Sequence, residues 1–507
     1  MRNKIFTQKS IKKEIKKQKL KNKTIVLCHG VFDLLHLGHI KHFESARTKG
    51  DFLIVSITSD KYVNKGPGRP LFNKDIRANT ISALSIVDAV IISNFETSEE
   101  IIKIIKPDIY FKGPDYKNNK KDLSKNIYKE IKAVKKYNGK IIYSNDETYS
   151  SSNLINNSGI LFNDEQKKFL NSIKKKYSFD YIFKTFERFN FLRPLIIGET
   201  IIDEYIFCDV LGKSGKEPHL VIKDEFVESY LGGAGAIANH LSSFCKKINF
   251  LTCIGDQNNH VNFIKKSIKK NINSKIIIKK NSPTILKKRF LDIVSRNKLF
   301  GVYSMNDQLV DLKTTQNIYN NIKNNFLGSD LLIISDYGHG FISDKLAKDI
   351  SKLNKFTALN AQVNASNYGY HSLNKYKKID SLIINETELR HEVRDKRTDV
   401  YALSKILKKK YKINNLIVTR GRNGALLIGN EKNKIIQCPA FTEKVIDKVG
   451  AGDTMLSIIS LCLKLKIPGE LSLLIGSLAG ANSVESIANS QTLDKKNLLR
   501  KIEYILK

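Results

Sequence analysis

Short runs rich in Ile and Val alternate with amphipathic helical patterns from residue 24 to residue 144, and this alternation constrains the fold more than any other feature. The predicted strands are residues 24–29, 52–58, 88–93, 108–112 and 140–144, and the predicted helices are residues 37–50, 74–84, 98–105 and 122–137. Strands that are separated by helices pair in parallel, because a helical crossover returns the chain to the same end of the sheet. The sequence therefore predicts a parallel sheet with helices on both faces.

A second and larger α/β unit begins with the predicted strand 194–199. Further buried strands are predicted at residues 330–335, 381–385 and 415–419. Two stretches, 204–231 and 285–304, carry strand-like patterns with no helix inside them, and they indicate a small β lid on the larger sheet. The fold class is therefore α/β, with two domains that each have a mainly parallel sheet.

Composition indicates where these domains begin and end. Residues 1–24 form a basic lead-in, and residues 153–163 are rich in Asn and Ser and close the first unit. Residues 164–190 place apolar side chains such as Phe169 and Phe186 among charges, which predicts one or two amphipathic connecting helices. The expected division is a lead-in at 1–24, a first domain at 25–157, a helical linker at 158–191 and a second domain at 192–507.

The chain is strongly basic, with 86 Lys and Arg against 50 Asp and Glu and a net charge of +36. A nucleic-acid-binding surface needs such charges in one patch or stripe. The Lys residues are instead spread along the whole chain together with many Asn and Ile, as AT-rich codon usage produces. We therefore expect no specific nucleic-acid partner, although basic pockets would suit phosphorylated substrates.

The cysteines and the N-terminus indicate the compartment. The six Cys form no Cys-x-x-Cys pair, so neither a zinc site nor a disulfide framework is predicted, and scattered thiols fit a reducing environment. The N-terminal residues carry charge but not the apolar core of a secretory signal, and no stretch has the length and apolarity of a membrane span. A cytoplasmic protein without a membrane partner is expected.

The first chemical motif follows the first predicted strand and reads His36-Leu37-Gly38-His39. It lies at the start of a predicted helix, where free N–H groups and the helix dipole attract phosphate. Two imidazoles three residues apart can both hydrogen-bond one phosphate, and Gly38 leaves room for it. Because this pattern rarely arises by chance between a strand and a helix, it predicts a phosphate site.

With this motif, residues 22–157 resemble the cytidylyltransferase-like nucleotidyltransferases. The resemblance also rests on the segments 30–51, 58–60, 65–70 and 111–116 and on a Ser-rich motif at 149–155. It implies a Rossmann-like sheet in which the two His stabilise the α-phosphate, the Ser motif holds the β- and γ-phosphates and Mg²⁺ lies on the triphosphate, which is ATP or CTP. The implied nucleotide-binding residues are Gly30, Phe32, His36, His39, Lys112, Ser150, Ser151 and Ser152, with Arg77 near the nucleotide or the acceptor.

The second chemical motif, Gly450-Ala451-Gly452-Asp453, precedes an apolar helix near the C-terminus. Small residues at a helix start let backbone N–H groups form an anion hole. Asp453 beside that hole can take the proton from an attacking hydroxyl while the hole binds the transferred phosphoryl group. The alternative is that Asp453 only caps the helix.

Four other segments accompany this motif, namely 232–235, 336–340, 385–388 and 419–424. Together they make residues 192–505 similar to the PfkB/ribokinase family of sugar kinases. The resemblance implies a ribokinase-like domain with a β lid, Asp453 as catalytic base, and Gly450, Ala451 and Gly452 as the anion hole. It also implies Asn385 and Glu388 as the pair that organises Mg²⁺ and phosphate without direct ligation, Thr419 and Gly421 near ATP, and Asp203, Gly232 and Gly233 near the sugar.

A sugar kinase joined to a nucleotidyltransferase implies consecutive steps, in which ATP makes a sugar phosphate and a nucleoside triphosphate then activates it. The pair resembles the bifunctional heptose kinase/heptose-1-phosphate adenylyltransferases of lipopolysaccharide precursor synthesis, with the module order reversed. The chain departs from them at Ala236, where their glycine-rich turn has Asn, and at residues 359–364, where they have an Asp-Pro-Lys-Gly run. Heptose as the substrate is therefore open.

Three interpretations follow from the sequence. The first is a cytoplasmic bifunctional enzyme that makes an ADP- or CDP-linked sugar for cell-surface polysaccharide. Its ligands are sugars, sugar phosphates and nucleoside triphosphates, and a homodimer is compatible with this interpretation. The second is a glycerol- or polyol-phosphate cytidylyltransferase fused to a kinase of an unrelated substrate. The third is a basic nucleic-acid-binding protein with relic sites, against which the intact His36, His39 and Asp453 argue.

Overall fold

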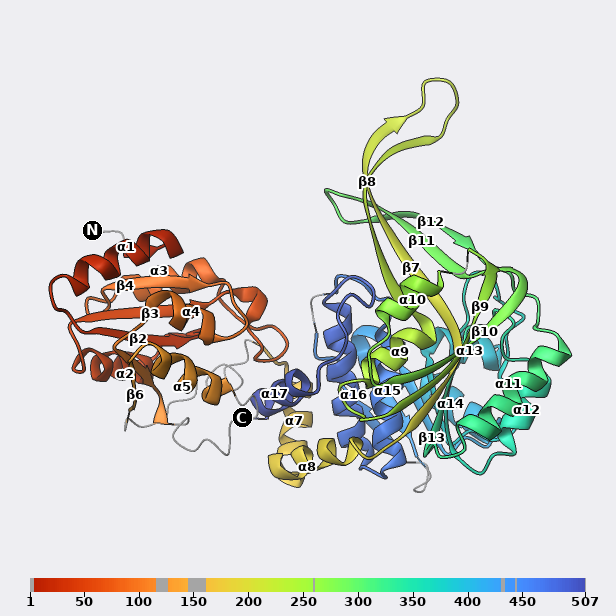
Figure 1. Cartoon of the computed structure of the whole chain (residues 1–507). Coiled ribbons are helices and arrows are strands. Elements are labelled where there is room, and N and C mark those ends of the chain that lie inside the picture. Colours follow the sequence, from red (N-terminus) through yellow and green to blue (C-terminus); the bar gives the residue numbers. More distant parts are fainter. Residues whose placement is uncertain are drawn as a thin grey trace. The chain divides into compact units, whose positions relative to one another are not determined.

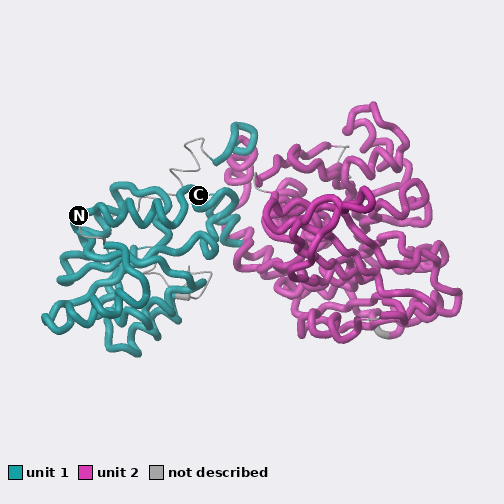
Figure 2. Tube along the Cα trace, turned by 90° about the horizontal axis from the view of Figure 1, so that it is seen from above, with its two compact units in different colours: residues 1–167, 499–507 teal, residues 168–498 magenta. Residues whose placement is uncertain are grey.

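A computed structural model describes residues 4–114, 126–144, 161–258, 260–429, 434–442 and 445–506. Contacts divide the chain into two compact units, which we call the first unit (residues 1–167 with 499–507) and the second unit (residues 168–498) (Figure 2). No helix within the described ranges is long and apolar enough to cross a lipid bilayer.

The first unit is a parallel six-stranded sheet in the order β1-β4-β3-β2-β5-β6 (Figure 1). Its strands are β1 (Ile5–Phe6), β2 (Ile25–Gly30), β3 (Phe52–Thr58), β4 (Ala89–Ser93), β5 (Ile109–Lys112) and β6 (Lys140–Tyr143). Its helices are α1 (Gln8–Lys19), α2 (Leu37–Arg47), α3 (Lys74–Ser82), α4 (Ser98–Ile105) and α5 (Asn126–Lys136). The parallel sheet with interleaved helices confirms the fold predicted from the alternating sequence pattern.

Two apolar clusters hold these helices against opposite faces of the sheet. On one face, α1, α4 and α5 contribute Ile11, Ile101 and Val134. On the other face, α2 and α3 contribute Phe43 and Ile81. The central strands are covered on both faces, so apolar residues occupy consecutive positions in their sequences. The strand order reverses between β2 and β5, and ligands of such sheets bind beyond the carboxyl ends of the strands at this point.

The basic lead-in contains an edge strand and a helix of this sheet. β1 pairs in parallel with β4. α1 begins with a capping box between Thr7 and Ser10 and buries Ile11 and Ile15. The sequence pattern did not indicate β1, because two residues are too short to show a periodicity.

The second unit has a main sheet in the order β10-β9-β7-β13-β14-β15-β16-β17-β18, and β8, β11 and β12 join it through β7. Its strands are β7 (Pro194–Lys213), β8 (Leu220–Gly232), β9 (Ile248–Gln257), β10 (Ile272–Pro283), β11 (Ile285–Asp292), β12 (Lys298–Ser304), β13 (Leu331–Asp336), β14 (Phe356–Ala361), β15 (Ser381–Asn385), β16 (Asn415–Thr419), β17 (Ala425–Ile428) and β18 (Ile435–Cys438). Its helices are α7 (Asp164–Lys176), which begins at the boundary between the units, α8 (Phe179–Phe189), α9 (Gly233–Leu241), α10 (Val261–Ser267), α11 (Leu312–Asn325), α12 (Asp344–Ser351), α13 (Glu386–Val393), α14 (Val400–Lys410), α15 (Ala451–Lys464), α16 (Gly469–Val484) and α17 (Lys495–Ile505), whose last residues belong to the first unit.

The long strand β7 connects the main sheet to the lid. Residues 194–199 pair with β9 and β13 at the centre of the main sheet. Residues 201–213 pair instead with β8 and β11, and β11 pairs with β12. The hairpin of β7 and β8 projects beyond the helices of the second unit (Figure 1). The lid predicted from the two helix-free stretches is therefore present, as the four strands β8, β7, β11 and β12.

The connecting segment predicted at residues 164–190 forms two helices, α7 and α8. α8 buries Phe186 and Phe189, whose ring centroids lie 6.0 Å and 6.4 Å from that of Phe244. This aromatic contact packs α8 onto the second unit, so its apolar stripe is part of a core, as such stripes usually are.

Candidate active sites

The first candidate site lies at the carboxyl ends of β2 and β5, where the strand order reverses. β2 ends at Gly30, the chain then turns through Phe32 with a φ of +49°, and α2 begins after His36. A Cβ on Gly30 would come within 2.9 Å of the Phe32 ring. Glycine at this position therefore allows Phe32 to fold back over the end of the strand.

Both predicted histidines lie together at the start of α2. His36 is the N-cap residue, and its Nδ1 accepts a hydrogen bond from the Gly38 N–H at 3.1 Å. The rings of His36 and His39 stack with 3.9 Å between centroids, and the Phe32 ring lies nearly perpendicular to that of His39 with 5.3 Å between centroids. Since Nδ1 of His36 is an acceptor, the neutral ring carries its proton on Nε2 and can donate there.

The environment keeps both imidazoles neutral at pH 7. Burial, together with the nearby His36 and Lys65, lowers the pKa of His39 to about 3. Burial and Lys65 also lower the pKa of His36. A bound phosphate would add negative charge beside these rings and raise the pKa of both histidines.

Lys112 ends β5 at the same edge of the sheet and is buried. Its Nζ pairs with Oε2 of Glu130 on α5 at 2.7 Å and donates to the Tyr110 hydroxyl at 3.4 Å. The Ser98 hydroxyl donates to the other oxygen of the Glu130 carboxylate. Glu130 could not be predicted from the sequence, because it is one charged residue within an ordinary amphipathic helix.

A buried ion pair anchors the segment 65–70 beside this site. Arg69 donates to Oδ2 of Asp33 at 2.9 Å, and the N–H of Phe72 donates to Oδ1 at 3.1 Å. Both charged side chains are almost fully buried. Asp33 and Arg69 both belong to motif segments of the sequence, but they are 36 residues apart, so their ion pair could not be predicted from spacing.

Arg77 is a structural residue of the loop after β2. The side chain donates to the carbonyl oxygens of Val31, Thr58 and Phe72 at 2.5, 2.8 and 2.9 Å and to Asp60 at 2.6 Å. With 2% of its surface exposed, it is enclosed by protein acceptors rather than open to a ligand. These bonds hold the loop in place, and a position of Arg77 near the nucleotide or the acceptor, which the family resemblance implied, stays a prediction.

Replacing Arg77 by Met should destabilise the first unit by about 2–4 kcal/mol, because three buried carbonyl oxygens lose their donor. The exposed residue Asn79 on the same helix provides the control, since Asn79→Met changes no buried contact. Urea unfolding of the two variants measures the difference. A loss for Arg77→Met no larger than that of the control would contradict this role.

Three predicted nucleotide-binding residues, Ser150, Ser151 and Ser152, lie outside the described residues. The structure therefore brings together Gly30, Phe32, His36, His39 and Lys112, all at the carboxyl edge of the sheet. This arrangement offers imidazole and backbone donors at a helix start, and these are the groups that bind phosphate.

The second candidate site lies at the carboxyl edge of the main sheet of the second unit. α15 begins there after Gly450, which has a φ of +89°. A Cβ at Gly450 would collide with Oδ1 of Asn489, so the turn requires glycine. Ala451 and Gly452 form the first turn, and nothing within 4 Å fills the space where a Gly452 side chain would be. The predicted anion hole thus has open space beside it.

Asp453 lies in the first turn of α15 and accepts a hydrogen bond from the Tyr337 hydroxyl at 2.7 Å. Burial raises the pKa of Asp453 to about 7, and the Tyr337 hydrogen bond partly opposes this. The nearby charges of Asp203 and Lys287 raise and lower it respectively. A carboxyl group with a pKa near neutrality is suited to act as a general base.

The buried carboxylate of Glu199 fixes the loop that carries Tyr337. It accepts hydrogen bonds from the N–H groups of Tyr337 and His339, both at 3.1 Å. Asn364 and Asn367 donate to the carbonyl oxygen of Tyr337 at 2.8 Å each. The sequence pointed to the loop 336–340 through its glycines, but the glutamate that holds it carried no recognisable pattern.

Asn385 and Glu388 form a capping box at the start of α13. Glu388 accepts from the N–H groups of Asn385 at 2.9 Å and Val363 at 3.3 Å, and burial raises its pKa to about 7. Asn385 is the register partner of Thr419 on β16, and Gly421 follows with a φ of +56°. These four predicted residues therefore lie at one edge of the sheet.

Asp203 lies on β7 where the main sheet passes into the lid, and it is buried. Arg289 of β11 donates to its Oδ1 at 2.5 Å. A Cβ on Gly232 would collide with Oδ2 of Asp203, and Gly233 follows with a φ of +59°. The predicted sugar-binding residues are thus in contact, and Arg289 is a partner that the sequence did not indicate.

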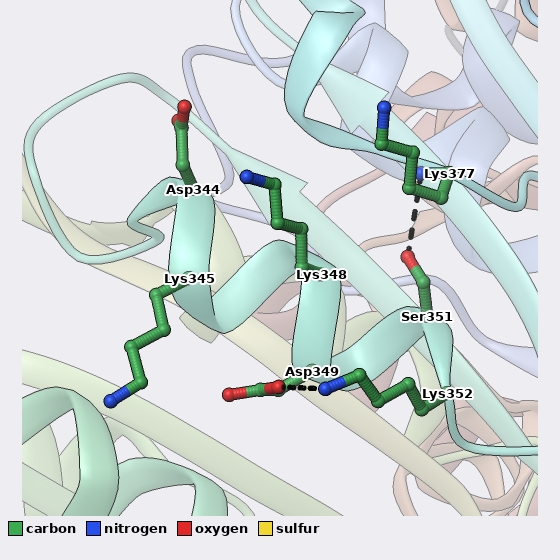
Figure 3. A pocket seen from close by; sticks show the side chains of 7 residues that line it. All are labelled: Asp344, Lys345, Lys348, Asp349, Ser351, Lys352 and Lys377. Carbon is green, nitrogen blue, oxygen red and sulfur yellow. Dashed lines mark hydrogen bonds and ion pairs between the residues drawn. The ribbon is translucent and has the colours of Figure 1, made fainter.

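A pocket on the surface of the second unit lies beside α12, apart from the residues predicted to act (Figure 3). It is lined by Asp344, Lys345, Lys348, Asp349, Ser351, Lys352 and Lys377. Lys352 pairs with Asp349 at 2.7 Å, so part of its positive charge is compensated within the pocket. Exposed charges of this kind are typical of a solvated helix surface.

A mainly parallel sheet with a β lid, and a carboxylate at a helix start beyond the carboxyl edge, define a ribokinase-like α/β fold. Residues 194–496 match the family described as pfkB family carbohydrate kinase. This match covers more than half of the chain, and the chain belongs to that family. Residues 27–157 match the cytidylyltransferase-like family, so this domain precedes the kinase-family domain.

Curated relatives match the N-terminal part of the chain. Bifunctional protein HldE of Syntrophotalea carbinolica is 39% identical over 116 residues, which are 22% of this chain and 24% of that protein. Bifunctional protein HldE of Aliarcobacter butzleri is 44% identical over 120 residues, which are 23% of this chain and 25% of that protein. The chain thus spans only a quarter of the length of these relatives.

A solved structure resembles the second unit. Escherichia coli phosphofructokinase-2, in complex with potassium, superposes with a TM-score of 0.51 and 15% identity, over 62% of this chain and 99% of that one. At this identity the likeness shows the fold alone, and it agrees with the ribokinase-like fold that the sequence predicted.

Proposed function

We propose that the chain is a bifunctional sugar kinase and sugar-phosphate nucleotidyltransferase that makes an ADP- or CDP-linked sugar. The observation that carries this proposal is the presence of two separately assembled sites in one chain. One is the stacked pair His36 and His39 at the start of α2, and the other is Asp453 at the start of α15. We propose a heptose-like sugar for cell-surface polysaccharide as the substrate, which the resemblance of the two motif sets to bifunctional heptose kinase/adenylyltransferases favours.

In the proposed kinase step, the sugar lies near Asp203 and the Gly232–Gly233 turn. Asp453 takes the proton of the sugar hydroxyl while its oxygen forms a bond to the γ-phosphorus of ATP. The bond from this phosphorus to the bridging oxygen breaks, and ADP leaves. Thr419 and Gly421 are proposed to contact ATP, and the N–H groups of residues 450–452 to bind the moving phosphoryl group.

In the proposed transferase step, a phosphate oxygen of the sugar phosphate attacks the α-phosphorus of ATP or CTP, and pyrophosphate leaves. His36 and His39 would donate hydrogen bonds to the α-phosphate, which needs no covalent intermediate. Lys112 and the Ser motif at 150–152 are proposed to hold the other phosphates. The stacked geometry supports this, because it aims two neutral imidazoles at one place.

Mg²⁺ is the cofactor proposed for both steps. Within the part of the chain that the structure describes, no group of three or more His, Cys, Asp or Glu side chains could hold a metal. We propose that the nucleotide phosphates carry this ion and that Glu388 acts on it indirectly. Mg²⁺ supplies charge neutralisation of the triphosphate when bound.

Sugar phosphorylation should weaken as the pH falls below about 7, because the pKa of Asp453 is raised to about 7 and only its ionised form accepts a proton. The value of kcat/KM should fall about tenfold per pH unit below this pKa. Replacing Tyr337 by Phe removes a hydrogen bond that lowers this pKa, so the acid limb should move to higher pH. A flat profile, or a shift of the variant to lower pH, would contradict the assignment.

A substrate screen tests the proposed function. The purified chain is incubated with sugars and ATP, and separately with sugar 1-phosphates and either ATP or CTP, and the products are identified by mass spectrometry. We expect one sugar to gain a phosphate and one sugar phosphate to become a nucleotide sugar. The absence of both products across the screen would refute the proposal. The proposed place of action is the cytoplasm, which the six free cysteines support.

A further inference from the structure

A buried lysine that belongs to no motif lies near both Asp203, which is proposed to bind the sugar, and Asp453, the proposed catalytic base. Lys287 is on lid strand β11 and is 6% exposed. Its register partner on the neighbouring strand β7 is Asp203. Its Nζ lies 5.8 Å from the ring centroid of Tyr337, the residue whose hydroxyl binds Asp453. A single tyrosine ring therefore connects the ammonium group to the proposed catalytic base.

The ammonium group has ring contacts but no acceptor. Its Nζ lies over the rings of Tyr303, at 5.3 Å from the centroid, and of Tyr337. Among the residues that the structure describes, no oxygen forms a hydrogen bond or an ion pair with Nζ of Lys287. A buried charge without such a partner is costly, so packing alone does not account for it.

The charges around Lys287 come from three elements. β7 contributes Asp203 and Glu199, α15 contributes Asp453, and β11 itself contributes Arg289. Asp203 forms an ion pair with Arg289, and Asp453 accepts a hydrogen bond from the Tyr337 hydroxyl. Neither carboxylate forms an ion pair with Lys287. Burial lowers the pKa of Lys287, and the three carboxylates oppose this. The ammonium group thus lies near Asp203, which is proposed to hold the sugar, and near Asp453, the proposed base.

We infer that Lys287 is a catalytic residue that binds a non-bridging oxygen of the phosphoryl group during transfer from ATP. This inference rests on the kinase function proposed above. As the bond between the sugar oxygen and the γ-phosphorus forms and the bond to the ADP oxygen breaks, Lys287 donates hydrogen bonds and keeps its proton, and Asp453 takes the hydroxyl proton. The start of α15 supplies partial positive charge on one side, and Lys287 supplies a full charge on the lid side.

Lys287→Met should reduce kcat for sugar phosphorylation by about 100-fold or more and leave the KM for ATP within about threefold, because the contact is made with the moving group. Lys288→Met is the matched control. Lys288 is the next residue on β11, points to the other face of the lid and pairs with Glu204 at 3.7 Å. It should keep wild-type kcat. Removal of an uncompensated buried charge should not lower the unfolding midpoint of Lys287→Met.

A binding measurement separates this inference from the proposed function. ADP with aluminium fluoride imitates the transferring phosphoryl group, and calorimetry compares its affinity with that of ADP alone. Wild type and Lys288→Met should bind the fluoroaluminate complex at least about tenfold more tightly than ADP, and Lys287→Met should lose this gain. Tightening that survives in Lys287→Met, or a kcat within about threefold of wild type, would overturn the inference.

The two tests fail differently. If wild type shows Lys287-dependent tightening but phosphorylates no sugar, the proposed sugar-kinase function fails and the phosphoryl site stands. If it phosphorylates a sugar and Lys287→Met does so equally well, the function stands and the inference fails. If wild type shows neither turnover nor tightening, both fail.

Discussion

Asp453→Asn is expected to reduce sugar-dependent ADP formation by about 10²–10⁴-fold, the range of a lost general base. The substitution keeps the size of the side chain and its ability to accept from the Tyr337 hydroxyl, but it removes the basic oxygen. ATP affinity should stay close to that of wild type, because the nucleotide is proposed to contact Thr419, Gly421 and the backbone of 450–452. Steady-state kinetics and calorimetry measure the two quantities separately.

The outcome also decides whether Asp453 only stabilises the start of α15, where Gly450 and not Asp453 is the N-cap residue. Asn keeps the size of the side chain, so a purely structural role would leave turnover largely intact. If Asp453→Asn kept more than about a tenth of wild-type turnover, the general-base role would be wrong. If ATP affinity disappeared as well, Asp453 would belong to the nucleotide site or to the fold.

The second large effect is expected for His39→Ala in the first unit. Loss of the imidazole should reduce pyrophosphate release by about 100-fold or more, because a donor to the developing charge on the α-phosphate is lost. Sugar phosphorylation should remain near the wild-type rate, since His39 and Asp453 belong to different units. Pyrophosphate and ADP are measured in parallel on the same preparation.

Lys41→Ala serves as the control for His39→Ala, because Lys41 is exposed on the same helix two residues further on. It should keep both activities. An equal loss of both activities in a folded His39→Ala protein would contradict the separation of the two sites. Retention of full pyrophosphate release would show that the histidine pair is not the α-phosphate site.

The fold class followed from the sequence because both units are built from continuous apolar runs and amphipathic helices. The strands at 52–58, 381–385 and 415–419 have the predicted bounds. Other strand ends differ by one or two residues, as at β2, where pairing and not composition decides the boundary. β7 was predicted as separate strands, because the polar residues Glu199 and Thr200 interrupt the apolar run, whereas the backbone continues from the main sheet into the lid.

The candidate sites followed from the sequence only where a motif is local. His36 with His39, and residues 450–453, lie within one helical turn, so spacing alone brings them together. Partners that come from distant strands and helices could not be predicted this way. Glu130 beside Lys112, Arg289 beside Asp203 and Lys287 beside Tyr337 depend on tertiary packing that sequence spacing does not encode.

The central claim is that two independent sites on one chain carry out successive steps on the same sugar. The most direct measurement mixes Asp453→Asn with His39→Ala and follows the conversion of the free sugar to the nucleotide sugar by mass spectrometry. If the kinase product is the transferase substrate, each variant alone should stop at a different compound, and the mixture should form the nucleotide sugar. Where a phosphate must change position between the steps, the enzyme that moves it is added to every reaction. The claim would be contradicted if the mixture formed no nucleotide sugar although each variant kept its remaining activity, Asp453→Asn on another sugar phosphate and His39→Ala on another sugar.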